Sequence, residues 1–214
     1  MHLFSAQHNQ DYAARCIEAT APRVKESGFL APPWPHVGDI NGTARGTGAR
    51  FNAGKPPFEL IPLRMLADAM SEDSVEQIAL GWLGFFQEAP DDRNLVECLD
   101  TLGFAGWVEC AQVFGYGAQK YKAHNWMRGM PWSVPLGCAV RHLMAMHEGE
   151  VADPESGLPH RGHVFCNVVM LRHFLRTYTE GNDLPPLELW KPARPGLCVP
   201  PRDLAAFQPQ QVQA

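Results

Sequence analysis

Apolar residues recur at every third or fourth position through much of this chain, and this spacing is the feature that most restricts its fold. Leu63, Leu66, Ala67 and Met70 begin the pattern, which continues with interruptions to about residue 179. This is the period of a helix with one buried face. No segment shows the convincing apolar and polar alternation of a strand. The sequence therefore predicts an all-α protein, a compact bundle of four to six helices.

Capping residues, glycines and prolines set the expected helix boundaries. Ser74 and Ser133 are suitable N-caps for two of the helices. The glycines at 115–117 are expected to stop or bend a long helix that is kinked near Gly103 or Gly106. The five expected core helices cover residues 63–70, 74–86, 94–114, 135–148 and 159–179. One further amphipathic helix is expected in the N-terminal extension, over residues 11–26.

Composition and charge exclude several classes of protein. The formal net charge of −5 is unusual for a general binder of duplex nucleic acid. No run of about 18 apolar residues suits a membrane span, and the first residues lack the pattern of a secretory signal. None of the six cysteines forms a CxxC pair, so we expect reduced core thiols in a cytoplasmic protein.

A first group of candidate functional residues surrounds the glycine at position 54. Arg50, Asn52 and Lys55 offer charge-assisted hydrogen bonds to phosphate oxygens, and a glycine lets the backbone approach an anion closely. The segment is not a Walker A loop, because Ala49 and Pro56 occupy positions that the motif reserves for other residues. The alternative is an exposed turn with a solvated lysine.

A second group lies where the 94–114 helix is expected to end. Tyr116 and Trp126 could stack on a nucleobase, Asn125 could hydrogen-bond to its edge, and Lys120 adds a positive charge nearby. The alternative is a helix end whose aromatic residues pack at the rim of the core.

A third group, rich in carboxylates and imidazoles, spans two helices and the loop between them. Its members are Arg141, His142, Glu148, Glu150, Asp153, Glu155, His160, His163 and Asn167. Because His160, His163 and Asn167 are three and seven residues apart, they share one helix face. Oxygen ligands suit Mg²⁺, and a histidine ligand favours Mn²⁺ or another transition metal. The alternative is a set of turn-capping residues and surface histidines.

Three blocks of the chain resemble a known family. They are ARFNAGKPPFELIPLRML, FGYGAQKYKAHNWMRGMPWS and RHLMAMHEGEVADPESGLPHRGHVFCNVVMLRHFL. Together they are similar to the phage dATP/dGTP diphosphohydrolases, MazZ-type relatives of the MazG nucleotide pyrophosphohydrolases. The resemblance covers about residues 49–70 and 111–176.

The resemblance implies a MazG-like all-α bundle that forms a homo-oligomer in the host cytoplasm. It implies cleavage of dGTP or dATP to the monophosphate and pyrophosphate, with Mg²⁺ or Mn²⁺, in phage nucleotide metabolism. The expected organisation is an irregular N-terminal extension (1–48), a nucleotide-binding domain (49–180) with a helical insertion (71–110), and a proline-rich tail (181–214).

On this hypothesis the candidate residues divide by role. The expected metal ligands are Glu150, Asp153, His160 and His163. Glu148 or Glu155 is the expected general base, and Arg141 stabilises negative charge during the reaction. The expected substrate-binding residues are Arg50, Asn52, Lys55, Tyr116, Lys120, Asn125, Trp126, His142 and Asn167.

Two other functions remain open on the sequence. MazG proteins use paired ExxE and ExxD motifs on helices, and this chain has no ExxE. The chain could therefore be a sponge that binds a signalling nucleotide without cleaving it. It could also be a helical interaction protein whose polar stripe forms a subunit interface.

Overall fold

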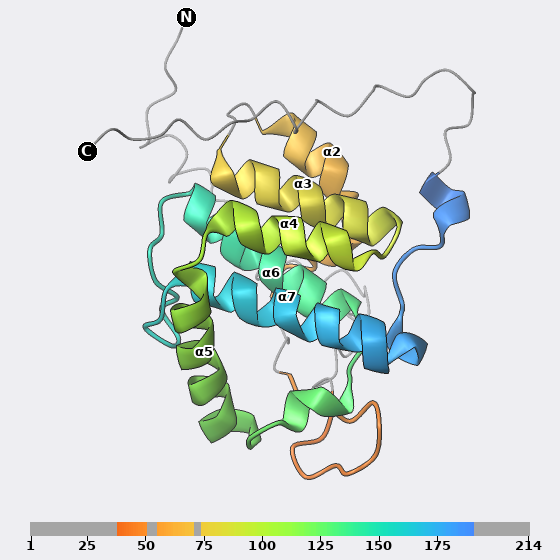
Figure 1. The fold of residues 1–214 in the computed structure, drawn as a ribbon, viewed down its shortest axis with the longest axis vertical. Coiled ribbons are helices and arrows are strands. Elements are labelled where there is room, and N and C mark those ends of the chain that lie inside the picture. Colours follow the sequence, from red (N-terminus) through yellow and green to blue (C-terminus); the bar gives the residue numbers. More distant parts are fainter. Residues whose placement is uncertain (1–37, 51–54, 71–73, 191–214) are drawn as a thin grey trace, which may run out of the picture. The chain divides into compact units, whose positions relative to one another are not determined.

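The computed structural model describes residues 38–50, 55–70 and 74–190 of the 214. Over these ranges the chain forms six α-helices and four short 3-10 helices and contains no strand, which confirms the predicted all-α class (Figure 1). The α-helices are α2 (Leu63–Ala69), α3 (Val75–Glu88), α4 (Asp92–Leu102), α5 (Gly106–Tyr121), α6 (Ser133–His147) and α7 (His160–Thr177). The 3-10 helices are η1 (Phe58–Leu60), η2 (Asn125–Arg128), η3 (Thr179–Gly181) and η4 (Leu187–Trp190). The helix expected over residues 11–26 lies outside the described ranges.

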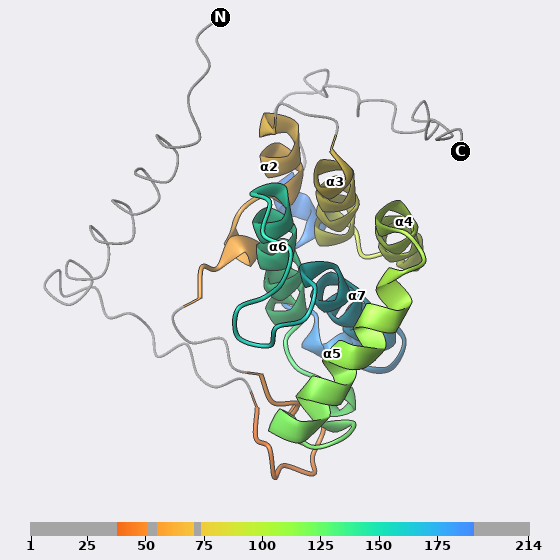
Figure 2. The same ribbon diagram turned by 90° about the vertical axis from the view of Figure 1, so that its left-hand side faces the viewer.

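The core lies between α3, α6 and α7. Helix α7 packs against α6, α5 and α4, and α3 packs against α2, α4 and α6 (Figure 2). Leu83 of α3, Leu136 of α6 and Leu171 of α7 are fully buried. The three-to-four-residue spacing of the sequence therefore corresponds to faces that are removed from water together. None of the helices in the described ranges has the length and apolar content that a membrane span requires.

The expected caps have different outcomes. The Ser74 side chain caps α3 by accepting a hydrogen bond of 3.2 Å from the backbone N–H of Gln77. The cap expected at Ser133 is wrong, because Ser133 is the first residue within α6. Its N–H donates to Asp183 at 2.8 Å and its hydroxyl to the same carboxylate at 2.5 Å. A residue that follows α7 thus supplies the anion at the start of α6.

The helix expected from 94 to 114 is also corrected. The chain forms two helices, α4 and α5, that are separated at Gly103, whose φ of 85° few other residues adopt. The glycines at 115 and 117 do not stop α5, which continues to Tyr121. Burial of Cys110 and Val113 on this helix outweighs the low helix propensity of glycine.

Candidate functional site

A pocket of about 330 Å³ lies beside the C-terminal half of α5. The other walls come from α7, from α6, from the loop between them, and from the residues on either side of positions 51–54. Nine of the residues singled out from the sequence line it: Arg50, Lys55, Tyr116, Lys120, Trp126, His142, Asp153, Glu155 and His163. Helices and loops that are far apart in the sequence therefore bring the three candidate groups to one cavity.

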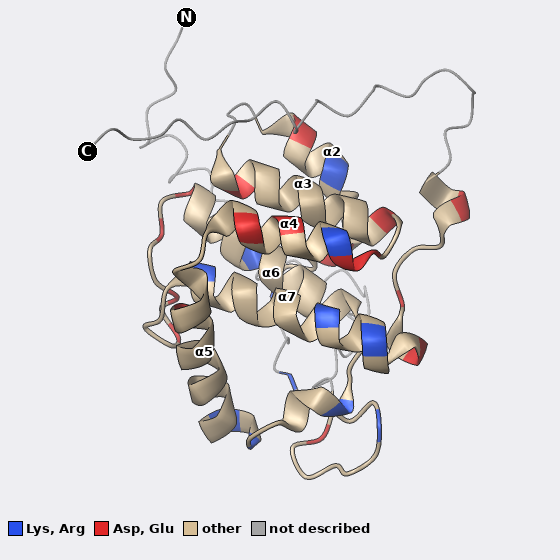
Figure 3. Cartoon of the chain, in the orientation of Figure 1, with Lys and Arg blue, Asp and Glu red and all other residues tan. Residues whose placement is uncertain are grey.

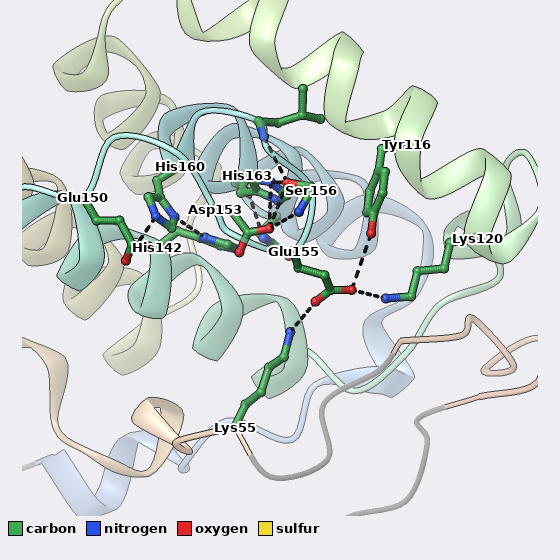
Figure 4. A network of polar contacts seen from close by, with 12 residues as sticks. Lys55, Tyr116, Lys120, His142, Glu150, Asp153, Glu155, Ser156, His160 and His163 are labelled. Carbon is green, nitrogen blue, oxygen red and sulfur yellow. Dashed lines mark hydrogen bonds and ion pairs between the residues drawn. The ribbon is translucent and has the colours of Figure 1, made fainter. Parts of the chain in front are cut away.

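Glu155 joins two cations at the pocket (Figure 4). Its carboxylate forms ion pairs with Lys55, at 3.5 Å, and with Lys120. The Tyr116 hydroxyl lies 3.5 Å from the same carboxylate. The hydrogen bond from Lys120 lowers the pKa of Glu155, and the charge of Lys55 lowers it further. The loop carboxylate thus holds two lysines where an anionic ligand would meet them.

Three imidazoles form a cluster between α6 and α7. The Nδ1 atoms of His142 and His160 are 2.8 Å apart and are joined by a hydrogen bond. The ring of His142 also stacks on that of His163, with 4.4 Å between centroids and 19° between planes. His160 and His163 share one face of α7, as their spacing of three residues predicts. The contribution of His142, from another helix, depends on how α6 and α7 pack.

Burial controls the protonation of two of these rings. Loss of solvation lowers the pKa of His142 to about 2, and the neighbouring His163 and Arg50 lower it further. Loss of solvation also lowers the pKa of His163 to about 4, although the charge of Asp153 opposes this shift. Both rings are therefore neutral at neutral pH and keep a nitrogen lone pair for a proton or a metal ion.

Ser156 links His163 to Asp153, and the sequence analysis did not assign it to the site. The Ser156 hydroxyl donates to Asp153 Oδ2 at 2.8 Å, so its oxygen accepts from His163 Nε2 at 2.8 Å. The backbone N–H of Ser156 donates to the same Oδ2 atom at 2.9 Å. The spacing Asp-x-x-Ser after a loop is a sequence signal for such a turn. It fixes the side chain of Asp153 at the pocket.

His142, Asp153 and His160 can supply the ligands of a metal ion. One donor atom from each residue lies within 4.8 Å of the other two. Glu150, an expected ligand, is instead 3.5 Å from Nε2 of His160 and lies outside this group. The other expected ligand outside it, His163, contacts Asp153 at 3.8 Å. Two of the four expected metal ligands, Asp153 and His160, therefore belong to this group. Its third member is His142, which was expected to bind substrate.

The apolar side of the pocket was not predicted. Val113, Phe114 and Tyr121 of α5 line it together with Cys166 and Met170 of α7. The signal available in the sequence was helical spacing, which identified these residues only as core. The cavity gives them a surface suited to a flat apolar group.

Arg50 lies at this side of the pocket among sulfur atoms. Its guanidinium is 3.8 Å from Met170 Sδ and interacts with the thiols of Cys138 and Cys166. Within the described ranges no carboxylate forms an ion pair with it. A part-buried cation with this environment favours an anionic ligand.

Asn125 has a different position from the one expected. Its side chain is 4% exposed, and its oxygen accepts a 2.6 Å hydrogen bond from the N–H of Ala49. Its nitrogen donates to the carbonyls of Asp39 and Ile40. The amide therefore holds the 38–49 loop beside the pocket and is not among the residues that line it. This position does not support the substrate-binding role that was expected for Asn125.

Three further expected site residues are not brought to the pocket. Glu148 is exposed at the end of α6, and Arg141 donates to the Pro56 carbonyl at 3.0 Å. Asn167 is fully buried and donates to the carbonyl of His163 at 2.7 Å. The structure therefore does not place Glu148, Arg141 or Asn167 among the residues that line the pocket, where their expected roles would require them. Asn52 lies outside the described residues.

Comparison with known proteins identifies one family. Residues 94–184 match the family model described as dATP/dGTP diphosphohydrolase, N-terminal. The matched segment includes α5, α6 and α7 and starts within the 71–110 segment that was expected to be an insertion. Arg50 and Lys55 lie before it. No curated protein matches the chain, and no solved structure does.

Proposed function

We propose that this chain, whose residues 94–184 match the dATP/dGTP diphosphohydrolase family model, cleaves a purine deoxynucleoside triphosphate at the pocket beside α5. We propose that water attacks the α-phosphorus and that pyrophosphate leaves, which gives the monophosphate and pyrophosphate as products. One observation supports this most directly. The group formed by His142, Asp153 and His160 adjoins a pocket that Lys55 and Lys120 also line.

The charge of the pocket favours a polyanion. Its described lining contains the cations Arg50, Lys55, Lys120 and Lys122 but only two carboxylates, Asp153 and Glu155. Positive side chains therefore outnumber negative ones at the pocket, although the whole chain carries a net charge of −5. A bound divalent ion adds two positive charges, which suits the several negative charges of a triphosphate.

The donor set fits a divalent metal. His142, Asp153 and His160 would hold it, and the neutral His142 ring offers a lone pair on Nδ1 once its single proton is on Nε2. Such an ion lowers the pKa of a bound water and neutralises charge on phosphate oxygens. Asp153 is kept in place by Ser156, so its orientation does not depend on the ligand.

Glu155 positions the lysines rather than acting as the strongest base. Its lowered pKa makes it a weak proton acceptor, and its partners Lys55 and Lys120 are the cations that a phosphate chain needs. On substrate binding the phosphate oxygens replace this carboxylate as the partner of one or both ammonium groups.

The apolar side of the pocket binds the nucleoside. Trp126 lies against Phe114, with ring centroids 5.2 Å apart, and lines the cavity together with Tyr121. Aromatic walls accept the face of any base, and a purine offers more surface for stacking than a pyrimidine.

The proposed activity is tested by incubating the full chain with each of the four dNTPs and Mg²⁺ or Mn²⁺, followed by mass spectrometry of the products. We expect dGMP or dAMP with pyrophosphate, and a fall to background in Asp153→Asn. Asp68→Asn, which changes an exposed aspartate of α2 outside the pocket, is the matched control. Full turnover by Asp153→Asn would show that the reaction occurs elsewhere.

The same experiment addresses the sponge hypothesis. The absence of an ExxE motif favours that alternative, because the metal-binding acid pairs of MazG proteins are incomplete here. Recovery of every nucleotide intact, with one retained by the protein, would replace hydrolysis by binding as the function of the pocket.

A further inference from the structure

The imidazole pair between α6 and α7 restricts the class of metal ion that suits this site. We propose that His142 and His160, each through Nδ1, and Asp153 bind a transition-metal ion such as Mn²⁺ in preference to Mg²⁺, with Glu150 orienting His160. This inference rests on the proposed function for its biological role. Metal binding itself is measured without nucleotide, so the two proposals can fail separately.

The first step concerns the direction in which His160 presents its lone pair. The ring is 3% exposed, and its Nε2 atom is buried without a hydrogen bond, 3.5 Å from Glu150 Oε2. A carboxylate beside Nε2 favours a proton on that nitrogen, which leaves the lone pair on Nδ1. Histidine ligands of metals commonly direct their second nitrogen to a carboxylate in this way. Nδ1 of His160 faces Nδ1 of His142.

The second step concerns Asp153. The contacts that the described residues make with its carboxylate, from Ser156 and His163, all use Oδ2. Oδ1 is therefore available as a ligand atom while Oδ2 fixes the orientation of the group. One carboxylate oxygen and two imidazole nitrogens, contributed by α6, α7 and the loop between them, then converge at one place (Figure 4).

The third step concerns which ion these donors select. Mg²⁺ binds almost entirely through oxygen and is held mostly by carboxylates and water, whereas Mn²⁺, Fe²⁺ and Co²⁺ accept imidazole nitrogen. Metal–nitrogen bonds of about 2.1 Å place adjacent donors roughly 3.0 Å apart at 90° and roughly 3.4 Å apart at the tetrahedral angle. The observed Nδ1 separation is 2.8 Å. Two nitrogens this close together can bind one ion, which replaces the hydrogen bond that joins the rings in the absence of metal.

The experiment uses the full chain after treatment with EDTA and removal of the chelator. Calorimetric titration compares Mn²⁺ with Mg²⁺, and pulsed electron paramagnetic resonance of the Mn²⁺ form detects coupling to ¹⁴N of a bound imidazole. We expect Mn²⁺ to bind at least about tenfold more tightly than Mg²⁺, and ¹⁴N coupling to be present.

Variants identify the ligands. His142→Asn and His160→Asn should each weaken Mn²⁺ binding by at least about 10-fold to 100-fold, and Glu150→Gln by about tenfold. His147→Asn, on the same helix but outside the pocket, should bind Mn²⁺ as the unsubstituted protein does. Circular dichroism establishes whether each variant is folded.

Two outcomes would overturn the proposal: equal affinity for the two ions, or Mn²⁺ bound without ¹⁴N coupling. Both are measured on the unsubstituted protein, so they remain decisive if a variant does not fold. Hydrolysis with Mg²⁺ in the absence of ¹⁴N coupling would leave the proposed function intact and remove this inference. Mn²⁺ bound with ¹⁴N coupling but without hydrolysis would support this inference and contradict the proposed function.

Discussion

His142 and His163 illustrate how a single residue type acquires its chemistry from burial. Both rings lie at the junction of α6, α7 and the loop, where few water molecules can solvate a positive charge. The guanidinium of Arg50 acts on both and disfavours protonation further. The two residues therefore make the free energy of unfolding depend on pH, which exposed histidines do not.

The first prediction at the residue scale concerns stability at acidic pH. In the folded protein the pKa is about 2 for His142 and about 4 for His163. Both values lie below the pKa of 6.5 that a solvent-exposed histidine has in the unfolded chain. Their contribution is complete above pH 6.5 and is lost as pH falls toward the folded values, because the unfolded state then binds more protons. As the pH falls from 7.5 to 5, each ring should lower the free energy of unfolding by about 2 kcal/mol.

Urea unfolding of the metal-free protein at several pH values measures this loss. His163→Asn should show a shallower fall in the free energy of unfolding than the unsubstituted protein, by about 2 kcal/mol over the same interval. Equal pH dependence of the two proteins would contradict the neutral, buried state of this imidazole.

At the scale of helices, two glycines decide how closely α5 and α7 approach. A Cβ atom on Gly162 would lie 2.7 Å from Cβ and 2.8 Å from the carbonyl carbon of Glu109. One on Gly106 would lie 2.2 Å from the buried ring of Phe165. Arg161 and Glu109 pair at the same crossing, with contacts of 2.5 and 2.8 Å. This crossing sets the distance between the two helices that line the pocket.

A matched pair of glycine substitutions tests the crossing. Gly162→Ala should lower the free energy of unfolding by roughly 1–3 kcal/mol, because the backbone of α5 must move. Gly115→Ala, at an exposed position within α5 with no atom near the added methyl group, should raise it by about 0.5–1 kcal/mol. Chemical denaturation measures both. A stabilising Gly162→Ala would mean that the helices are not in close contact there.

Across the whole molecule, the distribution of charge differs from its total. Acidic residues mark α3 and α4, whereas basic residues mark the end of α5 and the C-terminal half of α7 (Figure 3). Arg172 and Arg176 pair with Asp92 of α4, at 2.7 Å each, so their charge is used within the fold. The lysines that line the pocket are the cations that we propose attract a nucleotide.

The prediction at this scale is that ligand binding stabilises the entire bundle. A purine dNTP at 100 times its dissociation constant should raise the free energy of unfolding by about 2.7 kcal/mol, because it binds only the folded chain. Mn²⁺ and a non-hydrolysable dGTP analogue are suitable for measuring the thermal shift. The double variant Lys55→Gln, Lys120→Gln should lose most of this shift, and the exposed Arg93→Gln should keep it. An unchanged shift in the double variant would exclude these lysines from binding.

The sequence by itself determined the helical class, most helix positions and the residues that could carry chemistry, because helical periodicity and residue type are local properties. It also placed His160 and His163 on one face, since their spacing lies within a single helix. It could not show that Asn125 holds a loop, that Arg141 bonds to Pro56, or that Glu148 stays outside the pocket. Those outcomes depend on partners supplied by distant segments. Only the packing of α5, α6 and α7 decided which polar groups meet one another and which line the pocket.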